Sequence, residues 1–213
     1  MRKFSPPKSK RGDREIMKKY KVPFVEYGKQ YLTQLKKELD YAFYKVMSEG
    51  NLILRDEVSK FEKTLAEFVG TKYAIGVGNG TDALMLSLKA AGIKEGDEVI
   101  TSSHTFFATI EAIVNNGAVP VLVDSNLDDL LMNEDEIEGK IIEKTKVIIP
   151  VHIAGDVCNM TKIMDVAQRH NLIVIEDACQ ALGTKWMDSD KNIDKMAGSF
   201  GLTGCFSFFP AKI

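Results

Sequence analysis

The sequence predicts an α/β fold built on a mainly parallel sheet with helices on both faces. From residue 72 onward, short β-rich runs alternate with helical stretches, and this alternation is typical of βαβ units. Hydrophobic residues make up 45% and charged residues 27% of 213 positions, a composition ordinary for a globular chain with a substantial core. The chain contains no internal repeat, low-complexity tract or linker that would divide it.

The expected elements follow in chain order. Apolar residues at helical spacing predict two helices first, one ending near Gly50 and one ending at Gly70, where glycine is a suitable C-terminal cap. Strands are then expected at residues 72–78, 98–101, 119–124, 147–151, 172–176 and 205–208. Helices are expected between them at residues 82–91, 106–115, 134–143 and 162–170, and Asn133 and the acids after it favour the start of the third.

Charge divides the chain into a basic tail and an acidic remainder. Residues 1–21 contain nine Lys and Arg against two acids, a charge of +7, so the remaining chain is −9 in a total of −2. A solvated, flexible tail is the interpretation we favour, and an arm that touches nucleic acid or an acidic surface is the alternative. We therefore expect a tail at 1–21, one large domain at 22–213 and no nucleic-acid partner.

Cysteine usage and hydropathy indicate a cytoplasmic protein. Cys158, Cys179 and Cys205 are odd in number, far apart and form no Cys-x-x-Cys pair, which favours a reducing compartment without a disulfide or zinc site. No apolar run approaches the roughly 20 residues of a membrane span, and the basic start lacks the apolar stretch of a secretory signal. We expect no metal site and no membrane partner.

Ligands of parallel sheets bind beyond the carboxyl ends of the strands, and the first such end is a Gly-rich turn before a helix. Gly78, Gly80 and Ala83 fit the dinucleotide pattern G-x-G-x-x-A. The next strand does not end in the acid that would hold a ribose, so a single phosphate at the helix start is the interpretation we favour. A tight turn without a ligand remains the alternative.

Two further strand ends present an aromatic ring and an acid. One of the adjacent Phe106 and Phe107 could stack on a flat heterocycle, although adjacent aromatic residues are also common in cores. His104 and His152 are expected to be structural. A later strand ends in Glu176 and Asp177, and an acid at such a strand end could pair with a protonated pyridine nitrogen, with a surface acid as the alternative. A magnesium site of the P-loop type is excluded because no G-x-x-x-x-G-K-[ST] occurs in the sequence.

The last segment places Lys212 among Phe and Pro residues, one position before the end of the sequence. Partial removal from water favours a nucleophilic amine, whereas a lysine near a chain end is ordinarily solvated. Ser207 is a candidate phosphate ligand. Together, a phosphate turn, an aromatic ring, a pyridine-pairing acid and a Schiff-base lysine describe a pyridoxal 5'-phosphate site.

These residues resemble the DegT/StrS family of pyridoxal-phosphate-dependent nucleotide-sugar aminotransferases, from about residue 22 onward. The resemblance lies in residues 22–24, 79–84 (NGTDAL), 96–101 (GDEVIT), 104–106 (HTF), 149–152 (IPVH), 175–178 (IEDA) and 206–212 (FSFFPAK). It implies the large domain of an aspartate-aminotransferase-like fold, ending before the small C-terminal domain.

The resemblance also implies roles for the site residues. Lys212 would hold the cofactor covalently. It would then be displaced from the cofactor and would transfer protons as general acid and base. Gly80, Thr81 and Ser207 would bind its phosphate, Phe106 would stack on its ring, Asp177 would pair with the ring nitrogen, and Gln180 would lie near the phenolic oxygen. The implied reaction moves an amino group, from glutamate, to a nucleotide-linked keto-sugar, in a homodimer when the chain is full length.

Three positions depart from the family pattern without removing chemistry: Asn79 stands where serine is usual, Cys179 where alanine is usual and Arg55 where many members have glycine. Two alternatives remain. One is an inactive truncated relic or cofactor-binding module of the same family. The other is a sugar dehydratase of the family, which would have histidine in place of Lys212.

Overall fold

A computed structural model of the chain describes residues 28, 31–50 and 52–212. It divides into two compact units, residues 1–53 and 54–213. In the first unit, a π-helical turn η1 (Tyr31–Leu35) leads into helix α3 (Lys36–Glu49), and Gly50 ends the helix in the left-handed conformation, φ 70°. The helix expected to end near Gly50 is confirmed. The basic tail at 1–21 lies outside the described residues, so the domain boundary at 21 stays a prediction.

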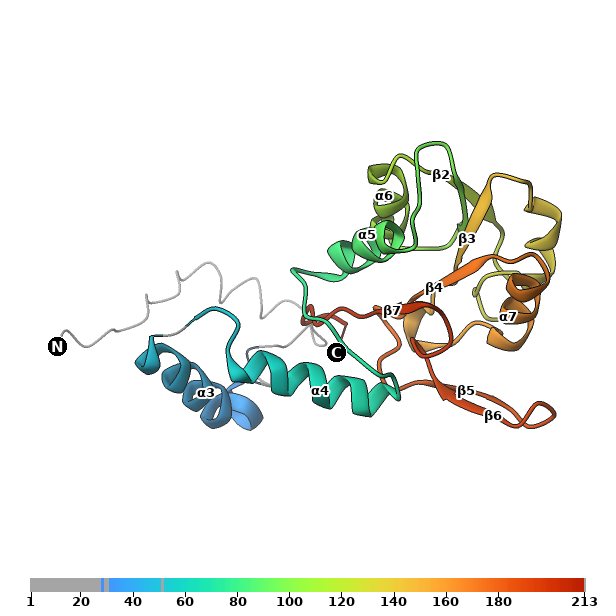
Figure 1. Cartoon of the computed structure of the whole chain (residues 1–213). Helices are drawn as coiled ribbons and strands as arrows, with labels where there is room; N and C mark the ends of the chain where they lie inside the picture. The colour runs from blue at the N-terminus through green and yellow to red at the C-terminus, as the bar shows by residue number, and fades with distance from the viewer. Residues whose placement is uncertain (1–27, 29–30, 51, 213) are drawn as a thin grey trace, which may run out of the picture. The chain divides into compact units, whose positions relative to one another are not determined.

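The second unit contains a five-stranded parallel sheet in the order β2-β1-β3-β4-β7 (Figure 1). Its strands are β1 (Glu98–Ser102), β2 (Val119–Val123), β3 (Thr145–Ile149), β4 (Ile173–Asp177) and β7 (Thr203–Cys205). Every pair of neighbours in this sheet is parallel. The predicted mainly parallel sheet is therefore confirmed.

Helices cover both faces of this sheet, as Figure 1 shows. On one face, α5 (Gly80–Ala90) and α6 (Phe107–Asn115) pack on strand residues such as Val147 and Ile175. On the other face, α7 (Met160–Arg169) packs on Ile148 and Val174. Helix α4 (Asp56–Val69) precedes these layers and ends at Gly70, φ 83°, as predicted.

Three sequence predictions differ from the structure, and the first of them was wrong throughout. Residues 72–78 form no strand, and the alternating Tyr73 and Ile75 face solvent, while the Gly76 N–H donates to the Glu62 carboxylate on α4 at 2.7 Å. An apolar alternation becomes a strand only where a sheet edge is within reach. The helix expected at 134–143 is two short 3₁₀ turns, η2 (Glu134–Glu136) and η3 (Glu138–Lys140).

The third difference concerns the end of the chain. The strand expected at 205–208 is β7, which ends at Cys205, and the backbone from 206 onward is irregular. An antiparallel hairpin of β5 (Lys185–Asp188) and β6 (Ile193–Met196) precedes it and was not predicted. A single 3₁₀ turn, η4 (Ile153–Gly155), follows β3.

All three cysteines are free thiols, and two of them, Cys158 and Cys205, are buried. Within the described ranges, no helix combines the length and the apolar character that crossing a membrane requires.

Candidate active site

Most of the predicted site residues meet at one edge of the sheet, beyond the carboxyl ends of β1, β4 and β7. Phe106 precedes α6 just after β1, Asp177 ends β4, and Ser207 follows β7 by two residues. The start of α5 packs against the same edge, because a Cβ added to Gly80 would lie 3.3 Å from Ser207 Cβ. This is the edge at which parallel sheets bind ligands.

The N-terminus of α5 offers backbone donors. Asn79 caps the helix by accepting the Asp82 N–H at 2.9 Å. The N–H groups of Gly80 and Thr81 precede the first helical hydrogen bond, and the helix dipole makes this end favourable for an anion. Gly80 is required for the close approach, because its added Cβ would lie only 2.8 Å from Cys179 Sγ.

Asp177 is nearly fully buried, at 5% exposure, and its carboxylate is held in place from two directions. Thr109 on α6 donates its hydroxyl to Oδ2 at 2.7 Å, and the Cys179 N–H donates to Oδ1 at 3.2 Å. Thr105 in turn lies 2.7 Å from the Thr109 hydroxyl. Because a buried carboxylate is stable only with such donors, this network fixes Asp177 at the carboxyl end of β4.

Lys212 reaches the same edge from the end of the chain. Its Nζ lies 5.1 Å from the centroid of the Phe106 ring, within the range of a cation–π contact. The Lys212 side chain is half-buried. The fold therefore brings an aromatic ring and a primary amine together although they are 106 positions apart in the sequence.

Ser207 presents its hydroxyl near the α5 terminus. The Ser207 oxygen accepts the Phe209 N–H at 3.3 Å, so the hydroxyl proton remains available to donate. The edge thus provides two backbone N–H groups, a hydroxyl, an aromatic face, a buried carboxylate and an amine.

Gln180 is also a predicted site residue, but its side chain is hydrogen-bonded to a different segment of the chain. Its amide oxygen accepts the Ala154 N–H at 2.9 Å, which ties it to η4, where Ala154 adopts the left-handed conformation at φ 54°. Among the described residues, no hydrogen bond connects Gln180 with Asp177, Ser207 or Lys212.

Cys179 is part of the site that sequence reasoning noted only as a departure from the family. Burial and then the neighbouring charge of Asp177 raise the pKa of its thiol, and the positive charge of Lys212 opposes them. The thiol, kept in its neutral form, therefore packs between Gly80 and Asp177.

Thr109 and Glu176 were also missed, whereas His152, expected to be structural, is buried and lies 3.0 Å from the Glu176 carboxylate. A signal for Thr109 was present, since it follows Thr105 by one helical turn and Phe106 by three residues. A signal for Glu176 was also present. Glu176 adjoins Asp177 in a strand, and consecutive strand residues face opposite sides of a sheet, so one of the two acids had to lie on the other face.

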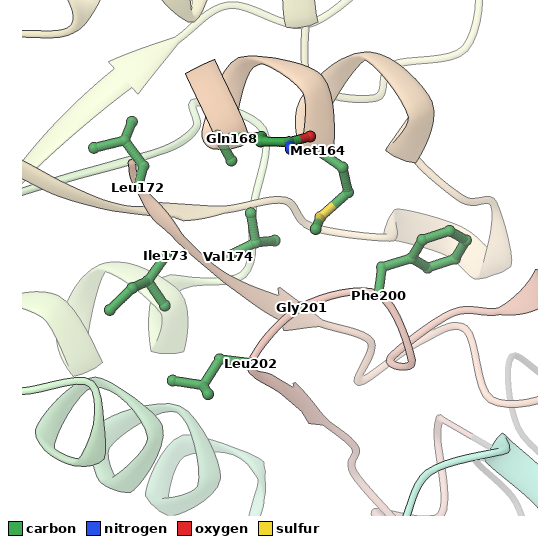
Figure 2. Close-up of a pocket in the computed structure, with 9 residues that line it drawn as sticks. Met164, Gln168, Leu172, Ile173, Val174, Phe200, Gly201 and Leu202 are labelled. Atoms are coloured by element: carbon green, nitrogen blue, oxygen red, sulfur yellow. The ribbon is translucent and has the colours of Figure 1, made fainter. Parts of the chain in front are cut away.

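An apolar groove of about 540 Å³ lies elsewhere, beside the first residues of β4 (Figure 2). Figure 2 shows the Met164 side chain of α7 between Val174 and the ring of Phe200, which lies on the loop before β7. At about 3.3 Å per residue, Ile173 and Asp177 are roughly 13 Å apart along the strand. The groove is therefore separate from the site at the carboxyl edge.

The fold and this edge define the class of α/β proteins that bind ligands at the carboxyl ends of a parallel sheet. More specifically, residues 33–213 match the model of the DegT/DnrJ/EryC1/StrS aminotransferase family. The chain belongs to this family, as its sequence motifs predicted.

Known relatives cover the chain well but are longer. A pleiotropic regulatory protein of Geobacillus stearothermophilus is 44% identical over 193 residues, 90% of this chain and 50% of the relative. The dTDP-3-amino-3,6-dideoxy-alpha-D-galactopyranose transaminase of Aneurinibacillus thermoaerophilus is 41% identical over 88% of this chain and 50% of its own. The chain thus spans about half the length of the curated relatives it matches.

Solved structures confirm the fold. S. venezuelae DesV, solved in complex with a ketimine intermediate, has a TM-score of 0.83 and 35% identity over 90% of this chain and 50% of its own. A DegT/DnrJ/EryC1/StrS aminotransferase from Brucella abortus has a TM-score of 0.79 and 38% identity over 90% of this chain and 51% of its own.

Proposed function

We propose that the chain is the cofactor-binding part of a pyridoxal-phosphate-dependent aminotransferase that transfers an amino group from glutamate to a nucleotide-linked keto-sugar. Family membership supports the reaction class. A related putative sugar aminotransferase from Streptococcus pneumoniae has been solved in forms named for pyridoxal and pyridoxamine phosphate, which supports the cofactor.

One observation carries the proposal: the buried Asp177 lies at the same edge as the α5 terminus and Lys212. The residues present fit pyridoxal 5'-phosphate, because an anion site, an aromatic face, a carboxylate and an amine match its phosphate, ring, pyridine nitrogen and aldehyde. The close packing of Gly80 on Ser207 concentrates phosphate donors at one point, as a single phosphate group requires.

In this proposal each residue has a distinct task. The N–H groups of Gly80 and Thr81 and the Ser207 hydroxyl bind the phosphate, and Phe106 supports the ring. Asp177 keeps the ring nitrogen protonated, with Thr109 and Cys179 holding its carboxylate in place. Gln180 is proposed to face the phenolic oxygen, supported by the family motif alone.

When bound, pyridoxal phosphate supplies an aldehyde that exchanges amines and a ring that accepts the electron pair left by a departing proton. Lys212 would be the residue that holds the group through this aldehyde, and its free amine would move a proton as general base and acid. Its ammonium now lies on the Phe106 face, so it must leave this face when a ring stacks there.

The test uses covalent trapping on the full chain. The chain is mixed with pyridoxal 5'-phosphate, reduced with borohydride and digested, and the expected result is a modified peptide with the label on Lys212. Lys212→Ala must abolish this label. A label spread over surface lysines, or one that persists in Lys212→Ala, contradicts the assignment.

A second measurement distinguishes the competing functions. An aminotransferase converts glutamate into 2-oxoglutarate in a single turnover, one equivalent per cofactor, whereas an inactive relic or cofactor-binding module binds the cofactor and produces none. The dehydratase alternative is disfavoured by the amine at position 212. It would gain support if the chain released water from a nucleotide-linked sugar without consuming glutamate.

We also propose a homodimer for the full-length protein. The second unit exposes large apolar side chains between residues 54 and 77, among them Leu54 at 88% and Ile75 at 81%, as surfaces that are covered in an assembly do. Analytical ultracentrifugation tests this proposal, and a monomer at all concentrations contradicts it. The cytoplasmic location inferred from the sequence stays a prediction.

A further inference from the structure

Glu176 is a fully buried acid near the site, on the opposite face of β4 from Asp177. Its side chain is 0% exposed and accepts four N–H groups. Oε1 accepts from Phe200 N at 2.6 Å and Gly201 N at 2.8 Å, and Oε2 accepts from Gly198 N at 2.8 Å and His152 Nε2 at 3.0 Å. Three of these donors belong to the loop between β6 and β7, residues 198–201.

His152 also donates its hydrogen bond to Glu176, as its second ring nitrogen shows. The Cys158 N–H donates to His152 Nδ1 at 3.2 Å, so the ring proton lies on Nε2 and points at Glu176. The His152 backbone N–H also donates to the Asp177 carbonyl at 3.0 Å. Because all four partners donate, only a carboxylate can satisfy them.

The 198–201 loop is in turn packed on the segment that leads to the site. A Cβ on Gly198 would lie 2.8 Å from Phe206 Cε2, and one on Gly204 would lie 2.7 Å from the Gly198 carbonyl carbon. The Phe206 carbonyl oxygen and Ser207 Cβ lie 3.7 and 3.3 Å from a Cβ placed on Gly80. Continuous contacts therefore connect Glu176, the loop, Phe206 and the phosphate-binding end.

We propose that Glu176, oriented by His152, is a positioning residue for the phosphate-binding end of the site. It fixes the 198–201 loop, and this loop holds Phe206 and Ser207 against Gly80. Glu176 faces the α7 side of the sheet, away from any ligand at the carboxyl edge, so it acts through these residues. The expected effect on cofactor binding rests on the proposed function, whereas the expected effect on the loop and on Ser207 does not.

The first arm of the test needs no cofactor. In Glu176→Gln, an amide NH₂ replaces one acceptor oxygen and faces a donor, so at least one loop N–H loses its partner. Exchange of the Gly198, Phe200 and Gly201 amides with D₂O should accelerate at least tenfold, and the amide NMR signals of Gly80 and Ser207 should shift. Unshifted Gly80 and Ser207 signals overturn the proposal.

The second arm compares pyridoxal 5'-phosphate with pyridoxal, which lacks the phosphate. Glu176→Gln should weaken binding of the phosphorylated form at least tenfold and change binding of pyridoxal less than threefold. Equal weakening of both forms, or no weakening, overturns the positioning role. Ile163→Val, which alters the same core without touching the carboxylate, is the control and should leave the ratio unchanged.

Two provisions keep the outcomes distinct. If Glu176→Gln does not fold, Phe206→Leu replaces it, since it shortens the side chain that packs on Gly198 while the carboxylate keeps its four donors, and the same loss of phosphate discrimination is expected. If the unaltered chain binds no pyridoxal phosphate, the proposed function fails, and the NMR arm still decides whether Glu176 positions Ser207.

Discussion

Gly80→Ala tests directly how the start of α5 packs on the candidate site. The added methyl carbon would lie 2.8 Å from Cys179 Sγ and 3.3 Å from Ser207 Cβ. Overpacking of this kind costs about 1–3 kcal/mol, and the better helix propensity of alanine returns at most about 1 kcal/mol. We expect the free energy of unfolding to fall by about 1–2 kcal/mol.

Cys179→Ala should relieve most of this cost, because it removes the atom that clashes. The nearest remaining atom is then Ser207 Cβ at 3.3 Å, a distance that a shift of a few tenths of an ångström can accommodate. In the double variant, the effect of Gly80→Ala should therefore be smaller by about 1 kcal/mol, a coupling typical of residues in contact.

Urea unfolding of the four chains, followed by circular dichroism, measures this coupling. Gly139→Ala is the matched control, because an added Cβ at Gly139 meets nothing within 4 Å, and it should not lower stability. The reasoning is refuted if Gly80→Ala costs as much in the Cys179→Ala variant as in the unaltered chain. It is also refuted if Gly80→Ala costs no more than Gly139→Ala.

Three further predictions follow from the second unit. Thr109→Val removes the hydroxyl bonded to Asp177 and should lower the free energy of unfolding by about 1.5–3 kcal/mol. Thr109→Ser keeps the hydroxyl and should lower it less. Equal losses of the two variants in urea unfolding contradict this reasoning. Burial raises the pKa of the Cys205 thiol to about 12, so the unfolded chain binds fewer protons above pH 9 and stability should fall as pH rises, by up to about 1.4 kcal/mol per pH unit. An unchanged slope in Cys205→Ala would exclude this thiol as the cause. Ala154→Gly should raise stability by about 0.5–1 kcal/mol, because Ala154 is left-handed at φ 54°, and thermal unfolding that shows a loss contradicts the strain argument.

The sequence predicted those parts of the fold that local patterns specify. β1 and β3 contain the β-branched runs 99–101 and 147–149, which are buried on both faces, and such runs are recognisable without knowing their neighbours. The segment at 72–78 also has a strand-like pattern, in which larger apolar residues alternate with small ones. It forms no strand, and Tyr73 and Ile75 are exposed. Whether an alternation becomes a strand depends on a partner edge, which local sequence does not specify.

Signals were present for two of the missed features. Asp188 ends β5, and Asp190 and Asn192 lie in the turn before β6; their N–H groups donate to the Asp188 carboxylate and the Ser189 carbonyl as in a tight turn. The expected helix at 134–143 contains Gly139, which lowers helix propensity, and its cap at Asn133 was identified correctly, since its side chain accepts the Asp135 N–H. In both places the local chemistry was recognisable, and the length of the element was not.

The neighbouring acids Glu176 and Asp177 show why a site can be located from sequence before its residues can be assigned. The strand-end rule places both at the carboxyl edge, and the two-residue period of a strand sends them to opposite faces. Both faces are covered by helices, so neither acid is distinguished by exposure. The distinction comes from distant partners, since Thr109 reaches Asp177 from 68 positions upstream and the loop amides reach Glu176 from 22 to 25 positions downstream. Asp177 shares its side of the sheet with α5 and α6, whose first residues border the site. Glu176 faces a closed loop, so its carboxylate can act on a ligand only through the backbone it holds.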